Sequence, residues 1–215
     1  MKFINLHTHK FSNQENILEI VNQYPQDFDA TIPNYSIGIH PWFIDENRVE
    51  ADLEIIEEKL KLKNCLALGE CGLDKRIEIP LDLQTQVFEK QLLLAHKYNK
   101  PIILHCVAAF QEIIEIRNKL KIEIPMIIHG FSKNEQTAKQ LLDNGFYLSF
   151  GKYLLRNPEL ETVFKQVPND RFFLETDTIE ETLEEVYNLA SKYKNIELEN
   201  FKHQINSNFK KVFNQ

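Results

Sequence analysis

The chain has 215 residues, of which 43% are apolar and 27% charged, so it can bury a sizeable core without disulfides or a structural metal. Its 25 basic and 32 acidic side chains give a net charge of −7, which argues against a protein that wraps nonspecifically around duplex nucleic acid. The three cysteines are odd in number and widely spaced, which predicts a reducing, cytoplasmic location. No apolar run approaches the roughly 18–20 residues of a membrane span, so no membrane contact is expected.

Short apolar runs of strand composition alternate with longer segments of helical periodicity, and this alternation predicts a mostly parallel sheet. The expected strands are, in chain order, residues 3–6, 17–22, 35–39, 65–69, 101–104, 125–128, 146–150 and 171–174. The expected helices are residues 49–62, 83–98, 108–120, 133–144, 157–166, 180–193 and 198–213. We therefore expect an α/β fold, a compact TIM-like (β/α)8 barrel that forms a single domain over residues 1–215. Its first β/α unit is reduced, because little chain is left for a helix beside the second strand.

Helix ends carry their own signals in the later part of the chain. Ser132 with Glu135, and Thr178 with Glu181, have the spacing of capping boxes and predict two helix starts. Gly145 follows a helical pattern at the position where a left-handed residue ends a helix.

Histidines and acids stand at the ends of the predicted strands. His7 and His9 end the first strand two residues apart, so strand periodicity places both side chains on one face. Later strands are followed by His40, Glu70, His105, His129 and Asp177. A lone residue of this kind is usually a surface or core group, but the carboxyl ends of parallel barrel strands meet at one mouth, where such barrels carry their chemistry. The repeated placement therefore predicts a shared site.

Four of these imidazoles and both carboxylates form a mixed nitrogen and oxygen donor set, which suits Zn²⁺, Mn²⁺ or a similar divalent ion. The set is His7, His9, Glu70, His105, His129 and Asp177. One carboxylate can bridge two ions roughly 3.5–4 Å apart, so we expect two divalent metal ions and metal-assisted hydrolysis. His96 and His203 lie in helical patterns and are expected to be structural, while Cys71 and Cys106 are expected to be buried small apolar residues.

Six short motifs in chain order resemble the TatD family of metal-dependent deoxyribonucleases. They are Asn5-Leu6-His7-Thr8-His9, Gly38-Ile39-His40-Pro41-Trp42, Gly69-Glu70-Cys71-Gly72-Leu73-Asp74, Ile103-Leu104-His105, Ile128-His129-Gly130-Phe131-Ser132 and Leu174-Glu175-Thr176-Asp177. The resemblance implies a TIM-barrel hydrolase. It also implies a nuclease dependent on Mg²⁺ or Zn²⁺, since members are described so and some are 3′-to-5′ exonucleases.

The resemblance also implies a role for each motif residue. One divalent ion would be held by His7, His9, Glu70 and Asp177, and Glu70 would bridge to a second ion held by His105 and His129. Asp177 would orient or deprotonate the attacking water. His40 would be an additional pocket histidine that holds the scissile phosphate or protonates the leaving group. The implied catalytic residues are therefore Asp177, Glu70 and His40.

Three departures from the family pattern bear on function. Asn5 stands where the family usually has Asp, and it can still hydrogen-bond a ligand histidine without raising its basicity as a carboxylate would. Trp42 replaces the second histidine of a His-Pro-His motif; its ring can stack on a base or pack in the core. Thr178-Ile179-Glu180-Glu181 stands in place of a loop with Pro and Arg, which weakens the case for nuclease activity more than the case for metal binding.

The leading hypothesis is a monomeric phosphodiester hydrolase that acts on single-stranded DNA. Trp42 and the cations Lys75 and Arg76 would flank the metals and bind substrate, unless Trp42 is a core residue and the Lys-Arg pair lies in a solvated loop. A second hypothesis uses the same metal centre on a small phosphoester, amide or lactone. A third is a metal-binding barrel without catalysis, although none of the six expected ligands is missing.

Overall fold

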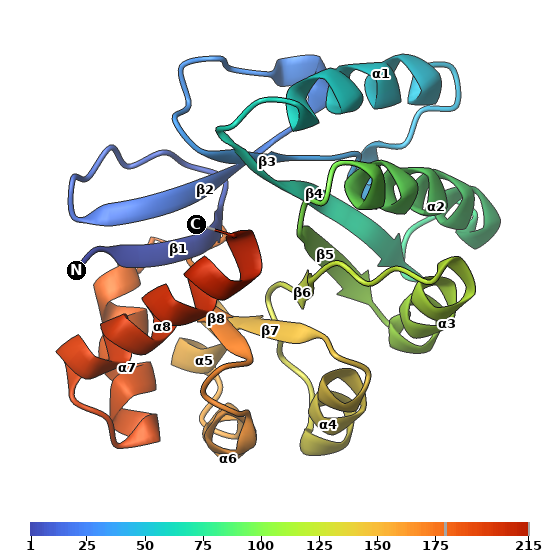
Figure 1. Ribbon diagram of the computed structural model, residues 1–215. Coiled ribbons are helices and arrows are strands. Elements are labelled where there is room, and N and C mark those ends of the chain that lie inside the picture. Colours follow the sequence, from blue (N-terminus) through green and yellow to red (C-terminus); the bar gives the residue numbers. More distant parts are fainter. Residues whose placement is uncertain (179, 215) are drawn as a thin grey trace. The chain divides into compact units, whose positions relative to one another are not determined.

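Parallel strands alternate with helices in a computed structural model, which describes residues 1–178 and 180–214 (Figure 1). In this described part the eight strands are β1 (Phe3–Thr8), β2 (Ile17–Gln23), β3 (Tyr35–Ile37), β4 (Cys65–Asp74), β5 (Ile102–Val107), β6 (Met126–Ile128), β7 (Tyr147–Phe150) and β8 (Phe172–Leu174). The α-helices are α1 (Val49–Leu60), α2 (Leu81–Lys97), α3 (Phe110–Leu120), α4 (Glu135–Asp143), α5 (Lys152–Arg156), α6 (Leu160–Gln166), α7 (Leu183–Lys194) and α8 (Leu198–Phe213). The strands follow chain order in the sheet.

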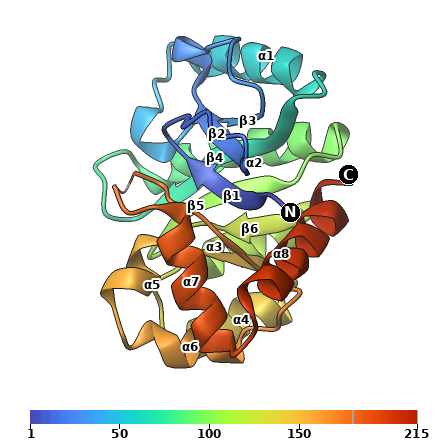
Figure 2. The same cartoon turned by 90° about the vertical axis from the view of Figure 1, so that its left-hand side faces the viewer.

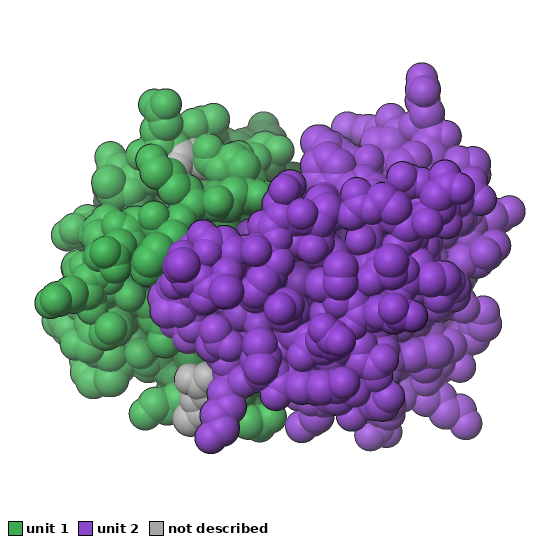
Figure 3. Space-filling model, turned by 90° about the horizontal axis from the view of Figure 1, so that it is seen from above, with its two compact units in different colours: residues 1–21, 128–215 green, residues 22–127 purple. Residues whose placement is uncertain are grey.

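The chain divides into two compact units (Figure 3). Unit 1 comprises Met1–Val21 and Ile128–Gln215, and unit 2 comprises Asn22–Ile127. Strands β2 and β6 run across the boundaries between them. A single domain over residues 1–215 remains our proposal.

Unit 1 is built on parallel pairs of β1 with β2 and of β7 with β8. Helices α7 and α8 pack against β1 (Figures 1 and 2). Aromatic rings fill the space between the helices and the strands: Phe172 lies 4.8 Å from Phe164 and 5.8 Å from Phe201, ring centre to ring centre. The first pair is edge-to-face and the second is tilted, and together they pack β8 against α6 and α8. Strand β8 leads to Asp177, one of the candidate site residues.

Unit 2 pairs β3 with β4 and β4 with β5, all parallel. Helices α1 and α2 cover this sheet and bury Ile56, Phe88 and Leu92 against it. Gly72 in β4 has φ +145°, and a Cβ there would lie 2.0 Å from the main-chain oxygen of His105, so only glycine fits where β4 and β5 approach.

The reduced first β/α unit is confirmed. Among the described residues no helix separates β1 from β2, and only the 3-10 turn η1 (Pro25–Asp27) lies between β2 and β3. No described helix is both long and apolar enough to cross a membrane. Helix α8 has the expected bounds, and Gly145 has the expected positive φ of 78°.

Several expected boundaries were wrong. Strand 65–69 continues as β4 to Asp74, because the chain beyond Glu70 keeps pairing with β5, and Glu70 therefore lies within a strand rather than at its end. The expected helix 157–166 is α6, which begins only at Leu160. The preceding helix α5 was not expected; it ends at Arg156, and its C-cap Asn157 is extended, as is usual for a residue before proline. Asn134, not Ser132, caps α4.

The capping box at Thr178 with Glu181 was also wrong. The box forms one repeat later, at Thr182 with Glu185, where α7 begins. Both Thr-x-x-Glu runs have the right spacing, but only the second directly precedes the buried face that starts at Leu183. Ile179, in the first run, lies outside the described residues.

Candidate active site

The first group of candidate ligands lies in unit 1, where β1 ends beside the segment that follows β8. The amide of Asp177 donates to the His7 carbonyl at 2.9 Å, and the amide of His9 donates to the Asp177 carbonyl at 3.1 Å. Asp177 has φ 55°, the left-handed conformation, at this junction. These main-chain contacts bring Asp177 into register with His7 and His9, which are about 170 residues earlier in the chain.

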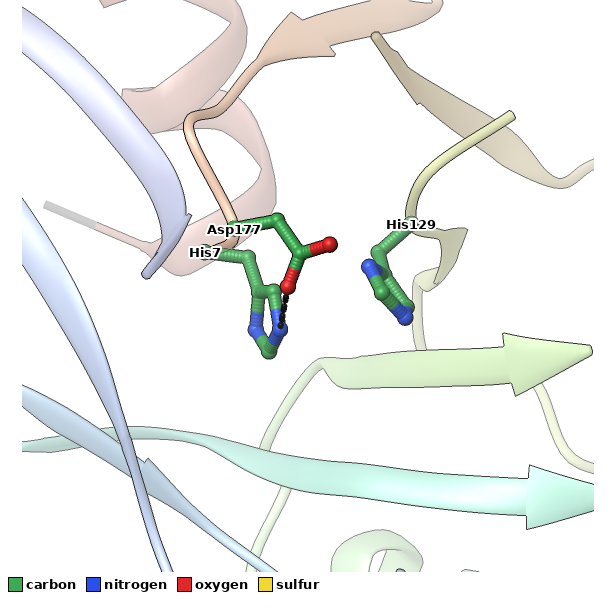
Figure 4. Close-up of side chains that lie close together, drawn as sticks. All are labelled: His7, His129 and Asp177. Atoms are coloured by element: carbon green, nitrogen blue, oxygen red, sulfur yellow. Dashed lines mark ion pairs between the residues drawn. The ribbon is translucent and has the colours of Figure 1, made fainter. Parts of the chain in front are cut away.

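We call His7, His9, His129 and Asp177 the β1 cluster. Asp177 Oδ1 lies 3.5 Å from His9 Nε2 and 3.9 Å from His7 Nε2. The rings of His7 and His129 are 4.4 Å apart, and Figure 4 shows both beside the Asp177 carboxylate. His7 is fully buried, whereas His9 is 28% exposed. The cluster is therefore mostly buried in unit 1 and reaches solvent on the side of His9.

Lys152, the first residue of α5, completes the surroundings of Asp177. Its Nζ donates to Asp177 Oδ2 at 2.8 Å, which leaves Oδ1 facing the histidines. Burial alone would raise the pKa of Asp177, but His129, His7 and the Lys152 hydrogen bond outweigh it and hold the pKa below its ordinary value. Asp177 is thus a carboxylate at neutral pH. Sequence reasoning missed Lys152, although a cation just beyond the carboxyl end of β7 was an available signal.

Glu175 lies on the Nδ1 side of the His129 ring. Its Oε1 accepts a hydrogen bond from the Gly130 amide at 2.7 Å and lies 3.4 Å from His129 Nδ1. Glu175 is 1% exposed, so its carboxylate is fixed by the protein. A carboxylate behind a histidine sets the tautomer and leaves the other ring nitrogen for a ligand.

Asn5 binds the residue before Asp177. Its Nδ2 donates to Thr176 Oγ1 at 2.9 Å and its Oδ1 accepts from the Thr176 amide at 3.0 Å. These two hydrogen bonds fasten β1 to the segment that follows β8. A hydrogen bond from Asn5 to a ligand histidine stays a prediction.

A groove of about 780 Å³ opens beside the β1 cluster, lined in part by His9 and Asp177. Its other charged lining residues are Lys10, Glu19, Glu180, Glu181 and Glu184. The groove is therefore mainly acidic.

The second group lies in unit 2 and consists of His40, Glu70, Asp74 and His105, which we call the β4 cluster. Glu70 Oε1 lies 3.2 Å from His40 Nε2 and 3.0 Å from His105 Nδ1. Asp74 Oδ2 lies 3.2 Å from His105 Nε2. All four side chains are nearly or fully buried, so the two imidazoles and two carboxylates share one low-dielectric space.

His40 caps the 3-10 turn η2 (Pro41–Phe43), and its Nδ1 accepts a hydrogen bond from the Trp42 amide at 3.1 Å. A neutral imidazole has one donor and one acceptor nitrogen. The His40 proton is therefore on Nε2, facing Glu70, so that this ring presents a donor to the site.

Buried amides of unit 2 hold the main chain around the β4 cluster. Gln91 accepts from the Ile39 amide at 2.7 Å, and Gln84 accepts from the Asp74 amide at 2.8 Å. Asn22 accepts from the Glu70 amide at 2.7 Å. Sequence reasoning missed all three, because a polar residue in a helix or strand carries no mark of the distant backbone it will bind.

The remaining candidates of unit 2 lie around this cluster. Trp42 is 55% exposed, so it is not a core residue. Lys75 forms an ion pair with Glu112, so its charge is partly compensated. Cys71 is buried as expected and burial raises the pKa of its thiol well above the ordinary range, whereas Cys106 is only partly buried.

The donor sets fit divalent ions. In unit 1, His7, His129 and Asp177 each present a ligand atom within 4.8 Å of the others, and in unit 2 His40, Glu70 and His105 do the same. Two imidazoles with a carboxylate form the mixed donor set of zinc and manganese sites, and the unit 1 group supplies it. In unit 2, His40 presents an N–H rather than a lone pair, so Glu70 and His105 are the ligands offered to an ion. The expected sharing of Glu70 with His7, His9 and Asp177 joins residues of the two units and stays a prediction. His96 and His203 lie exposed on α2 and α8.

Known proteins resemble this chain along its length. Its sequence is 33% identical over 165 residues to an uncharacterized metal-dependent hydrolase, YabD, of Bacillus subtilis, covering 74% of this chain and 62% of that protein. It is 30% identical over 166 residues to the 3′-5′ ssDNA/RNA exonuclease TatD of Edwardsiella piscicida, covering 74% and 61%. The chain thus spans less than two thirds of these relatives.

The fold has a close counterpart among solved structures. The Escherichia coli TatD homologue YjjV superposes with a TM-score of 0.84 at 20% identity, covering 99% of this chain and 98% of that one. This likeness confirms the expected TIM-like β/α barrel. The family model described as TatD-related DNase matches residues 1–214. With its strand-end histidines and carboxylates, the chain therefore belongs to the TatD-related DNase family.

Proposed function

We propose that this chain is a divalent-metal-dependent hydrolase that cleaves phosphodiester bonds in single-stranded DNA. The observation that carries the proposal is the pair of His/carboxylate clusters, each with ligand atoms gathered within 4.8 Å. Family membership supports the reaction class, and the exonuclease name of one relative supports the substrate.

We assign two ions, with ligands from His7, His9, Glu70, His105, His129 and Asp177, and with zinc, magnesium or manganese as the metal. When bound, such ions supply Lewis-acid activation of water and of the phosphate. Asp177 Oδ1 orients the attacking water, for which its low pKa keeps it an acceptor. His40, with its proton on Nε2, donates to the scissile phosphate or its leaving oxygen.

The exposed ring of Trp42 and the cation of Lys75 support a single-stranded substrate. Exposed bases stack on aromatic rings at about 1–3 kcal/mol each, which requires no broad basic surface. We further propose a cytoplasmic location, since the odd number and wide spacing of the three cysteines fit a reducing compartment. We also propose a monomer, since a barrel of this size can work alone.

The acidic groove favours a second candidate, a small phosphoester, amide or lactone. Apart from Asp177, the groove beside the β1 cluster has four glutamates and one lysine, and this balance repels a polyanion. The two candidate functions therefore differ in the substrate that should enter that groove, a DNA strand in the first and a small molecule in the second.

The test is a metal-loaded assay on single-stranded DNA, duplex DNA, RNA and a small chromogenic phosphodiester. Asp177→Asn and Glu70→Gln should each lower hydrolysis by orders of magnitude and, because they keep the shape of the side chain and its hydrogen-bonding atoms, leave unfolding of the metal-free protein nearly unchanged. His96→Ala is the matched control, with metal content intact. Cleavage of DNA should fall with added salt and be weaker on duplex. Full metal loading with no cleavage of any DNA would move the assignment to the small-molecule hydrolase.

A further inference from the structure

Trp42 makes a polar contact that its expected stacking role does not explain. It is the chain's only tryptophan, and it lies in η2 beside the β4 cluster. The residue is 55% exposed, but its Nε1 donates to Asp74 Oδ2 at 2.8 Å. The indole N–H is thus committed to a buried carboxylate although the residue as a whole is exposed.

Asp74 is held rigidly at the end of β4. It is 2% exposed, and its Oδ1 accepts from the Arg76 amide at 2.9 Å. Gln84 binds both its main-chain amide and its carbonyl, at 2.8 and 3.0 Å. The indole N–H therefore donates to the carboxylate of a residue whose main chain is held in place, and this hydrogen bond fixes the position of Asp74 Oδ2.

That same Oδ2 lies 3.2 Å from His105 Nε2, while His105 Nδ1 lies 3.0 Å from Glu70 Oε1. A carboxylate behind one ring nitrogen keeps the proton there and directs the lone pair of the other nitrogen to a metal. Asp74 is the natural candidate for this supporting part, because its oxygens are already engaged by Trp42 and Arg76. Glu70 lies on the side left for the ion.

We infer that Trp42 is a positioning residue, whose indole N–H holds Asp74 so that His105 keeps its proton on Nε2 and binds the divalent ion through Nδ1. The inference rests on the proposed metal-dependent function. It gives the single tryptophan a part in the metal centre in addition to any contact with substrate.

The variant Trp42→Phe separates the positioning of Asp74 from stacking on substrate, since it keeps an aromatic ring and removes the N–H. Zinc affinity is measured by competition with a chromogenic chelator, fitted for two ions. One of the two affinities should fall roughly 3- to 10-fold in Trp42→Phe and roughly 10- to 100-fold in Asp74→Asn. Phe43→Leu, on the same turn and 49% exposed, is the control and should change neither affinity by more than about twofold.

A spectroscopic readout needs no activity. In the zinc-loaded chain, long-range ¹H–¹⁵N spectra should show His105 protonated at Nε2, and Trp42 should give a single indole signal that moves with zinc and moves again in Asp74→Asn. Wild-type affinity in Trp42→Phe, or zinc bound through Nε2 of His105, would overturn the inference. A wild-type chain that binds no divalent ion would instead overturn the proposed function.

Discussion

Tyr187→Phe removes one oxygen atom that connects α7 to β1 in unit 1. The Tyr187 hydroxyl accepts a hydrogen bond from the Ile4 amide at 3.0 Å and donates to the Ile4 carbonyl at 2.9 Å. Tyr187 is fully buried and Ile4 is 1% exposed, so water cannot replace the lost oxygen. The substitution therefore removes the hydrogen-bond partner of the Ile4 amide and of the Ile4 carbonyl, in the strand that leads to His7 and His9.

The expected cost follows from those two groups. Each buried, unsatisfied polar group costs about 1–3 kcal/mol. Because phenylalanine has no hydroxyl to remove from water on folding, part of this cost is offset, and the net loss of unfolding free energy is about 2–4 kcal/mol. In urea, with a slope of about 2–3 kcal/mol per molar, the midpoint should fall by about 1 M.

Tyr193→Phe on the same helix is the matched control, because that side chain is only half-buried. It should change stability by no more than about 0.5 kcal/mol. If Tyr187→Phe behaves like this control in equilibrium urea unfolding, the hydroxyl does not hold β1 and the reasoning fails.

Three further substitutions test other contacts. Gly72→Ala should prevent folding or cost more than about 4 kcal/mol in thermal unfolding, because its Cβ would lie 2.0 Å from the His105 oxygen; an intact variant would contradict the described approach of β4 and β5. Burial lowers the pKa of Lys194 from 10.5 to about 8, so its protonation below pH 8 penalises the folded state, and stability should rise between pH 8 and 10.5. The stability of Lys194→Met relative to the wild type should therefore improve by about 1–2 kcal/mol between pH 10.5 and pH 7, after allowance for the half-exposed site, while loss of the Nζ hydrogen bonds to the Lys165 and Val167 carbonyls lowers it at every pH; a difference independent of pH in denaturant titrations would refute this cause. Glu175→Gln should weaken one divalent ion roughly 10- to 100-fold in chelator competition, and an unchanged affinity would show that Glu175 does not orient His129.

The elements most accurately predicted from sequence were those whose buried face repeats along the chain. Helix α8 was predicted at both ends, since Phe201, Ile205, Phe209 and Val212 recur at helical spacing. The capping box of α7 shows the limit of this reasoning. Two equivalent Thr-x-x-Glu runs follow one another, and tertiary packing of Leu183 decides which one caps the helix.

The candidate ligands were predictable because each stands in or just after an apolar strand. The residues that hold these ligands and their main chain in place could not be predicted from the sequence. Lys152, Glu175 and Gln91 contact groups far away in the chain, and their partners are set by how strands and helices pack. Asp74 was hidden for another reason, because the strand was expected to end before it.

The most direct test of metal binding is anomalous diffraction from crystals saturated with Zn²⁺ or Mn²⁺. The account predicts two peaks per chain, one beside His7, His129 and Asp177 and one beside Glu70 and Nδ1 of His105. Saturated crystals with no anomalous peak among these residues would contradict it.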